Sequence, residues 1–191
     1  MKIGIFSGSF NPIHIGHMVL ANFITEFTDI DEVWFLVTPQ NPLKEDAILL
    51  DENTRFEMTK LALADYPKLK ASDFEFSLPK PSYTVHTLEA LSEAYPENTF
   101  ALIIGADNWE AFDRWRDFEE ILEQYRIYVY PRFGYRISIS KKLKDRVEAL
   151  SSPVIEISST FIREALAKGK NMHAFLPESV HKYIIEKGLY L

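Results

Sequence analysis

Two histidines that stand three residues apart, His14 and His17, follow a loop of small residues near the start of the chain. This loop, Ser-Gly-Ser at positions 7–9, comes directly after a short apolar run, and Gly8 lets a ligand approach the backbone closely. A helix that begins near Ile15 would turn its free amides and the positive end of its dipole toward the loop. The spacing puts both imidazoles on one face of the first turn, where they offer neutral or cationic donors. The segment therefore predicts a site for an anion such as a phosphate.

A second anion site is predicted near the end of the chain. Ser158, Ser159 and Thr160 place hydroxyl groups where a helix is expected to begin, and Arg163 follows about one turn later. Taken alone, this pattern is that of a helix N-cap followed by an exposed arginine. Two such sites in one short chain, each directly after a predicted strand, favour a functional interpretation.

The motifs of other common phosphate and metal sites are missing from the sequence. There is no Gly-x-x-x-x-Gly-Lys-Ser/Thr, and Gly4 and Gly8 do not complete a Gly-x-Gly-x-x-Gly fingerprint. The absence of cysteine excludes disulfides and thiolate metal sites. A zinc site at the histidine pair would need a third ligand, and the other histidines are remote in sequence. We therefore expect no metal held by protein side chains.

Composition restricts the partners of the protein. The 191 residues carry a formal net charge of −7, with 47% hydrophobic and 26% charged residues, a balance typical of soluble globular proteins. There is no dense run of lysine and arginine, so we expect no nucleic-acid partner. No apolar stretch approaches the length of a membrane span, and the N-terminal apolar run is too short for a signal peptide. These features predict a cytoplasmic protein that does not bind membranes.

Short apolar runs alternate with helical patterns along the whole chain. Strands are predicted at 3–6, 32–38, 100–104, 126–130 and 154–157, and helices at 16–27, 53–65, 84–94 and in two C-terminal segments that end before Gly169 and Gly188. Continuous apolar strands between helices are typical of a parallel sheet covered on both faces. We predict an α/β fold: one domain, 1–191, with a single doubly wound, mainly parallel sheet and a small helical C-terminal part at 158–191.

Ligands of doubly wound folds bind at the carboxyl ends of the strands, where the strand order reverses. This rule selects four segments of the chain: 7–17, 38–46, 105–116 and 157–163. Both predicted anion sites lie within these segments, which strengthens the expectation that they serve one ligand site.

Three motifs together resemble a known family. They are the loop ending in His14-Ile15-Gly16-His17, the run Ile103-Ile104-Gly105-Ala106-Asp107, and the run Ile157-Ser158-Ser159-Thr160-Phe161-Ile162-Arg163. Their order, and a likeness that spans nearly the whole chain, resemble the bacterial nicotinate-nucleotide adenylyltransferases. These are Rossmann-like members of the nucleotidyltransferase superfamily with a His-x-Gly-His signature. Class I aminoacyl-tRNA synthetases share a similar signature, but their second, lysine-rich signature is absent here.

The resemblance implies a reaction. The phosphate of nicotinate mononucleotide would attack the α-phosphorus of ATP and give nicotinate adenine dinucleotide and pyrophosphate, a step of NAD biosynthesis. Because the acceptor phosphate is already a nucleophile, catalysis would consist mainly of alignment and stabilisation of charge. Mg²⁺ would be bound mainly through the ATP phosphates. The implied partners are ATP and nicotinate mononucleotide, and the protein would be a monomer or a homo-oligomer.

The resemblance also implies roles for individual residues. The catalytic residues would be His14, His17 and Arg163. The ATP-binding residues would be Gly8, Ser9, Phe10, His17, Gly105, Asp107, Ser158, Ser159, Thr160 and Arg163. The acceptor-binding residues would be Lys44, Tyr83, Thr84, Trp109, Trp115 and Arg116. Of the two tryptophans, Trp115 is expected to stack on the nicotinate ring and Trp109 is held in reserve.

Some of these residues also have simpler interpretations. Asp107 would accept hydrogen bonds from the ribose hydroxyls or cap a helix, and Lys44 would bind the acceptor phosphate or be an exposed loop lysine. The sequence departs from the family pattern at Asn11, where an acid is common, at Leu43, where a histidine is usual, and at His86, where an aspartate is usual. The last two lie in acceptor-side elements. The open alternatives are another acceptor, nicotinamide mononucleotide or phosphopantetheine, and a non-catalytic nucleotide-binding module.

Overall fold

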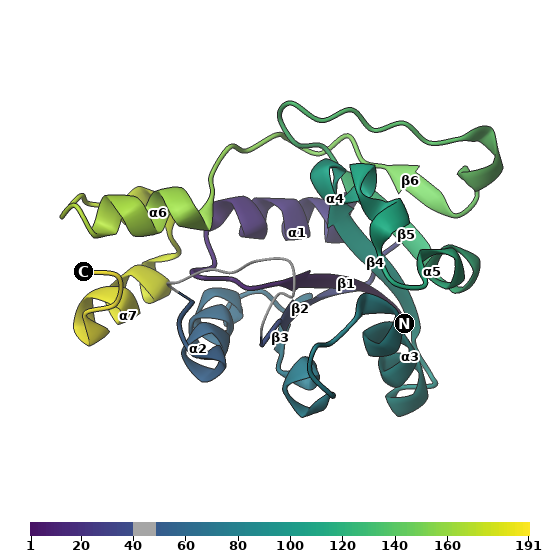
Figure 1. Cartoon of the computed structure of the whole chain (residues 1–191). Helices are drawn as coiled ribbons and strands as arrows, with labels where there is room; N and C mark the ends of the chain where they lie inside the picture. Colours follow the sequence, from purple (N-terminus) through teal and green to yellow (C-terminus); the bar gives the residue numbers. More distant parts are fainter. Residues whose placement is uncertain (40–48) are drawn as a thin grey trace.

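A six-stranded parallel sheet forms the centre of the protein (Figure 1). The structure, a computed structural model, describes residues 1–39 and 49–191. The strands are β1 (Lys2–Gly8), β2 (Glu32–Val37), β3 (Leu69–Ser72), β4 (Thr99–Gly105), β5 (Arg126–Tyr130) and β6 (Val147–Ala149). Their order in the sheet is β3-β2-β1-β4-β5-β6, and every neighbouring pair is parallel. The predicted doubly wound sheet is confirmed, with the strand order reversing between β1 and β4.

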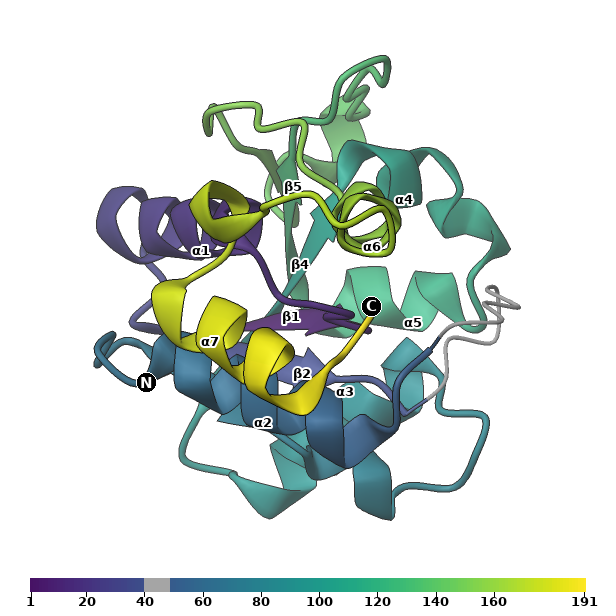
Figure 2. The ribbon, with the colours of Figure 1, turned by 90° about the vertical axis from the view of Figure 1, so that its left-hand side faces the viewer.

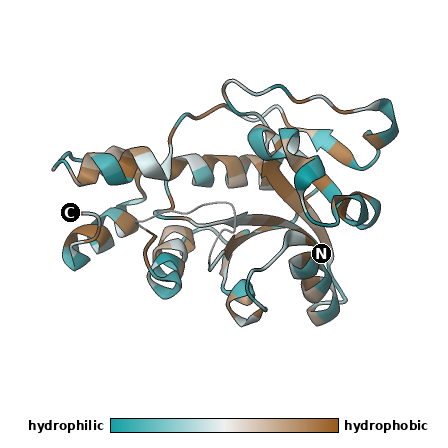
Figure 3. Ribbon diagram, viewed as in Figure 1, coloured by the Kyte–Doolittle hydropathy of each residue, from teal (hydrophilic) through white to brown (hydrophobic). Residues whose placement is uncertain are grey.

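Helices cover both faces of the sheet. They are α1 (Ile15–Phe27), α2 (Glu52–Leu63), α3 (Thr84–Ala94), α4 (Ala106–Glu110), α5 (Phe118–Gln124), α6 (Ser159–Leu166) and α7 (Glu178–Lys187). Buried residues of α1, α2, α6 and α7 form one hydrophobic core with one face of the sheet. Those of α3 and α5 form a second core with the other face. The four central strands, β1, β2, β4 and β5, carry apolar side chains in nearly continuous runs because both of their faces are buried (Figure 3).

The C-terminal helices pack back onto the body of the domain. Helix α6 begins at Ser158, whose side chain accepts a hydrogen bond from the backbone amide of Phe161. Helix α7 ends at Gly188, which adopts the left-handed conformation with φ of 63°. It lies alongside α2 (Figure 2), where the Ser179 hydroxyl donates to the Leu61 carbonyl at 2.9 Å. The capped ends and this contact hold residues 158–191 against the body of the domain.

The strand prediction was wrong at three places. Residues 154–157 form no strand. This segment follows β6 and is exposed to solvent, with 52% of Val154 and 36% of Ile155 accessible. Strands β3 and β6 were not predicted. They are the two edge strands of the sheet, with four and three residues, and each contains a charged side chain. A short, half-exposed edge strand has no continuous apolar run by which to recognise it.

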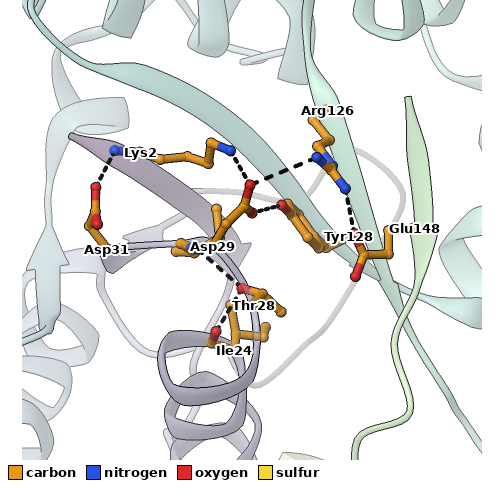
Figure 4. Close-up of polar contacts among 9 residues, drawn as sticks. Lys2, Ile24, Thr28, Asp29, Asp31, Arg126, Tyr128 and Glu148 are labelled. Atoms are coloured by element: carbon orange, nitrogen blue, oxygen red, sulfur yellow. Dashed lines mark hydrogen bonds and ion pairs between the residues drawn. The ribbon is translucent and has the colours of Figure 1, made fainter. Parts of the chain in front are cut away.

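A polar network closes the amino edge of the sheet (Figure 4). Asp29, in the turn between α1 and β2, accepts hydrogen bonds from Lys2 and from the hydroxyl of buried Tyr128. Arg126 bonds to Glu148 at 2.5 Å, which joins β5 to β6. The network ties three strands and one turn together at the edge opposite the carboxyl ends of the strands.

None of the helices in the described ranges is long and apolar enough to cross a membrane.

Candidate active site

A cavity of about 500 Å³ opens at the carboxyl ends of the central strands. It is lined by residues 6–10 and the first turn of α1, by 107–108 after β4, by 130–133 and Tyr135 after β5, and by 153–160 with Arg163. Every predicted ATP-binding residue except Gly105 lines it, and so does His14. The two anion sites predicted from the sequence are therefore two walls of one cavity, at the point where the strand order reverses.

The two histidines form a stacked pair at the start of α1. His14 is the N-cap residue, and its ring lies 3.7 Å from that of His17 between centroids, with 23° between the planes. The backbone amide of His14 donates to Nδ1 of His17 at 3.2 Å. Because Nδ1 is an acceptor in this bond, the proton of a neutral His17 ring resides on Nε2. Gly16 allows the stack, since a Cβ there would lie 3.1 Å from the ring of His14.

Both imidazoles are neutral at physiological pH. Burial, and secondly the charge of Arg132, lower the pKa of His14 to about 4. Burial, followed by the charges of His14 and Arg132, holds the pKa of His17 well below its ordinary value of 6.5. Of the neutral and cationic donors considered from the sequence, the structure favours the neutral form. Positive charge in the cavity comes instead from arginine side chains.

The low pKa of His14 predicts a titration that NMR can follow. In the free protein we expect the His14 imidazole to stay neutral as the pH falls from 8, with its midpoint near 4. The folded state resists protonation more than the unfolded state does. His14 therefore leaves stability unchanged above its ordinary pKa of 6.5 and lowers the free energy of unfolding as the pH falls from there toward 4. A midpoint above 6 for the assigned His14 Cε1–H resonance would contradict this environment.

Residues from the C-terminal part of the chain hold the loop between β1 and α1. The Ser159 hydroxyl donates to the Pro12 carbonyl at 2.9 Å, and Arg163 Nη1 donates to the Asn11 carbonyl at 2.9 Å. The Tyr190 hydroxyl donates to Oδ1 of Asn11 at 2.6 Å. Asn11 stands at a position where an acid is common in the family that the sequence resembles. An aspartate there could accept the same hydrogen bond from the Tyr190 hydroxyl. Loop and helix α6 form one hydrogen-bonded unit around the cavity.

An ion pair lies directly over the end of β4. Arg132 Nε is 3.2 Å from Oδ1 of Asp107. A Cβ on Gly105 would come within 2.4 Å of that carboxylate and 2.8 Å of Arg132 Nε, so the pair requires glycine at this position. Gly105 itself is the N-cap residue of α4, and the helix-cap interpretation of Asp107 is therefore wrong. Asp107 is a cavity-lining carboxylate in the first turn of α4.

Arg132 lines the cavity but was not among the site residues predicted from the sequence. Its Nη2 donates to the Tyr130 hydroxyl at 3.1 Å, and its side chain is half exposed at the cavity wall. A signal was present, because Arg132 stands two residues beyond the predicted strand 126–130 and the carboxyl ends of strands line such sites. The segments selected from the sequence did not include this strand end.

Comparison with known proteins shows the family to which the chain belongs. The family model described as cytidylyltransferase-like matches residues 5–165. A Bacteroides fragilis protein named "Probable nicotinate-nucleotide adenylyltransferase" is 54% identical over 97% of this chain and 92% of its own length. The chain belongs to the nicotinate-nucleotide adenylyltransferase family. A Flavobacterium johnsoniae protein of the same name is 48% identical over 100% of this chain and 99% of its own. The family is a group of nucleotidyltransferases, as the motifs predicted.

A solved structure shows the same fold. The Plasmodium falciparum nicotinic acid mononucleotide adenylyltransferase, complexed with NaAD, superposes with a TM-score of 0.80 at 21% identity, covering 99% of this chain and 97% of its own. At that identity the likeness concerns the Rossmann-like backbone. The six parallel strands and their covering helices are therefore the architecture of the adenylyltransferase family.

Among the predicted acceptor residues that the structure describes, none lines the cavity. Trp109 stacks on Phe112 at 5.4 Å and its indole N–H donates to the Ser138 carbonyl, while the ring of Trp115 is tilted against Phe112 at 5.2 Å. The Arg116 guanidinium lies 4.7 Å from the centre of the Tyr83 ring. Thr84 is the first residue of α3. The structure thus brings Tyr83 and Arg116 together and places the tryptophans against the second core; Lys44 lies outside the described residues.

Proposed function

We propose that this protein transfers the adenylyl group of ATP to nicotinate mononucleotide, with formation of nicotinate adenine dinucleotide and release of pyrophosphate in NAD biosynthesis. The observation that carries the proposal is the single cavity where the neutral histidine pair, the start of α1 and the hydroxyls and arginine of α6 meet. These groups are donors and cations that suit a polyphosphate. Their place at the switch point of the sheet is the usual ligand position of such folds.

The chemistry needs no proton transfer from the protein. A phosphate oxygen of the acceptor forms a bond to the α-phosphorus of ATP, and the bond from that phosphorus to the bridging oxygen breaks, so that pyrophosphate leaves with the electron pair. Negative charge grows on the bridging oxygen and redistributes over the α-phosphate. The N–H at Nε2 of His17 and the ring of His14 are the proposed donors to these oxygens. As neutral imidazoles they stabilise charge without acting as general acids.

The remaining ATP contacts are proposed from the walls of the cavity. Arg163 and Arg132 are the cations for the β- and γ-phosphates, and the hydroxyls of Ser158 and Thr160 are donors beside them. The Ser159 hydroxyl would have to turn from the Pro12 carbonyl to donate to a phosphate. The backbone of Gly8, Ser9 and Phe10 would face the α-phosphate, and Asp107 would face the ribose. Gly105, which does not line the cavity, would contribute by leaving space for the Asp107 carboxylate. Asp107 already pairs with Arg132, so ribose binding would share or displace that ion pair.

Magnesium enters the proposal together with ATP. Within the described ranges, no group of three histidine, aspartate or glutamate side chains is placed to hold a metal ion. The cavity instead offers donors and cations, a set that fits a magnesium ion carried by the phosphate oxygens of the substrate. When bound, that ion neutralises phosphate charge; the protein groups orient the phosphates around it.

The acceptor side is proposed from the family resemblance. Trp115, with Trp109 as the alternative, would flank the nicotinate ring, and the amides near Arg116 with Tyr83 and Thr84 would meet its carboxylate. Lys44 would bind the phosphate of the mononucleotide. We further propose a cytoplasmic location. We also propose that the protein is a monomer or a homo-oligomer, which the molar mass from analytical ultracentrifugation distinguishes.

A panel of acceptors tests the proposed function. Pyrophosphate release from ATP and Mg²⁺ is measured with nicotinate mononucleotide, nicotinamide mononucleotide and phosphopantetheine under identical conditions. We expect kcat/KM to be highest for nicotinate mononucleotide, because a carboxamide lacks the negative charge and replaces one of the two acceptor oxygens with an NH2 donor, which would face the proposed amide donors. Activity with phosphopantetheine alone would overturn the acceptor, and no activity with any of the three would favour a binding module.

A further inference from the structure

Arg55 is a fully buried cation in helix α2, away from the cavity lining. Its side chain is 0% exposed, and it makes four hydrogen bonds, all to backbone carbonyls. Nε donates to Leu50 at 2.8 Å, and Nη2 donates to Pro39 at 3.0 Å. Nη1 donates to Ser9 at 2.6 Å and to Thr38 at 2.8 Å. Among the residues that the structure describes, no carboxylate forms an ion pair with it.

The four carbonyls belong to three segments at the carboxyl edge of the sheet. Ser9 is in the cavity-lining loop that follows β1. Thr38 and Pro39 follow β2, which pairs with β1 so that Gly8 lies opposite Val37. Leu50 precedes the Asp51 cap of α2. One guanidinium therefore joins the proposed ATP-binding loop to the backbone that leaves β2 on the proposed acceptor side.

The guanidinium of Arg55 both costs and contributes free energy. Removing it from water is unfavourable, and burial accordingly lowers the pKa of Arg55. An apolar side chain of similar volume would avoid that cost but would leave the four carbonyls without this donor. What only the arginine fork supplies is several donors in a fixed plane, which set the relative positions of the groups that accept from them.

We propose that Arg55 is a positioning residue, which holds the ATP-binding loop at Ser9 and the acceptor-side backbone at Thr38 and Pro39 in one fixed relation. The inference rests on the proposed function. In a reaction whose catalysis is alignment of two phosphates, such a tie contributes to turnover in the ternary complex more than to the binding of either substrate alone.

The test compares variants of Arg55 with matched variants of its own helix. Arg55→Met removes all four bonds, and Arg55→Lys keeps a charge but cannot reproduce the planar fork. Met58→Ala and Thr59→Ala are the controls: both side chains are 0% exposed on α2, and the Thr59 hydroxyl bonds to the carbonyl of Arg55 within the helix. All are assayed at a temperature where each is folded by circular dichroism, with both substrates saturating.

We expect Arg55→Met to lower kcat by about 10- to 100-fold, on the scale of a lost alignment. The dissociation constant of ATP alone, measured by calorimetry, should change by less than about threefold, and Arg55→Lys should fall between Arg55→Met and the parent. The two control variants should keep kcat within about twofold, because the Thr59 hydroxyl donates within the helix and the thioether of Met58 has no proton to donate to the tied carbonyls. A kcat within twofold of the parent for Arg55→Met, or an equal loss in Met58→Ala, would overturn the inference. If Arg55→Met does not fold, Arg55→Lys carries the same comparison.

Amide hydrogen exchange gives a readout that does not need activity. Peptides that cover residues 7–14 and 33–39 should exchange faster in both Arg55 variants and be unchanged in Met58→Ala. Faster exchange in the Arg55 variants, combined with a parent protein that shows no adenylyl transfer, would reject the proposed function and leave the structural tie standing. Unchanged exchange in both Arg55 variants would reject the tie.

Discussion

His17→Ala is expected to lower kcat by about 10²-fold or more, the usual scale for losing a preorganised donor to transition-state charge. The half-buried ring of His17 lines the cavity, and its Nδ1 accepts from the His14 amide, so the neutral ring presents its Nε2–H as a donor. A fixed neutral donor needs no reorganisation as charge grows on the phosphate oxygens. Steady-state pyrophosphate release at saturating ATP and acceptor measures the effect.

Two further substitutions separate the two nitrogens of His17. His17→Asn can retain an acceptor near the position of Nδ1 and so preserve the bond from the His14 amide, but it loses the Nε2 donor. His17→Gln can place an amide donor near Nε2. We expect the asparagine variant to be as slow as His17→Ala and the glutamine variant to recover part of the rate. Near-normal turnover in a folded His17→Ala protein would remove His17 from the mechanism.

Arg132→Met is expected to lower kcat/KM for ATP by about 10- to 100-fold, since a charge-assisted hydrogen bond contributes roughly 1.5–3 kcal/mol. Arg132 is half exposed in the free protein, but a polyphosphate would cover it and exclude water. The substitution also releases Asp107 from its ion pair. Initial rates over a range of ATP concentrations give the change, and circular dichroism checks the fold.

The variant has a second readout that does not depend on turnover. The charge of Arg132 lowers the pKa values of His14 and His17, so Arg132→Met should raise the pH midpoint of His14. Arg136→Met is the matched control, because Arg136 is exposed four residues further along and does not line the cavity. An unchanged kcat/KM together with an unchanged His14 midpoint would show that Arg132 does not face the phosphate site.

The sequence predicts the centre of the fold better than its edges. β1, β2, β4 and β5 are buried on both faces, so their apolar runs identify them, and the parallel arrangement follows from the helices between them. β3 and β6 pair on one side only and keep polar residues. The apolar run at 154–157 resembles a buried strand, yet it lies at the mouth of the cavity, where a ligand rather than another strand can cover it.

The same contrast holds for the site. His14, His17 and the run from Ser158 to Arg163 could be predicted because each motif is contiguous and its chemistry is local. Arg132 and Arg55 act through partners from other segments, and a single arginine in a polar stretch carries no sign that it will be buried or paired. The acceptor residues rested on resemblance alone, and their aromatic rings also meet the ordinary needs of core packing.

The carbonyl contacts of Arg55 have a consequence for how this family varies in sequence. A carbonyl is present at every position whatever the side chain, so residues 9, 38, 39 and 50 can be exchanged without losing a partner for the guanidinium. Only the arginine itself is irreplaceable. Statistical methods that find contacts from correlated substitutions need both partners to change together, and this tie would leave them no such trace. In an alignment of the family, the tie would be visible as an invariant arginine at position 55, with variable residues at the positions whose carbonyls it contacts.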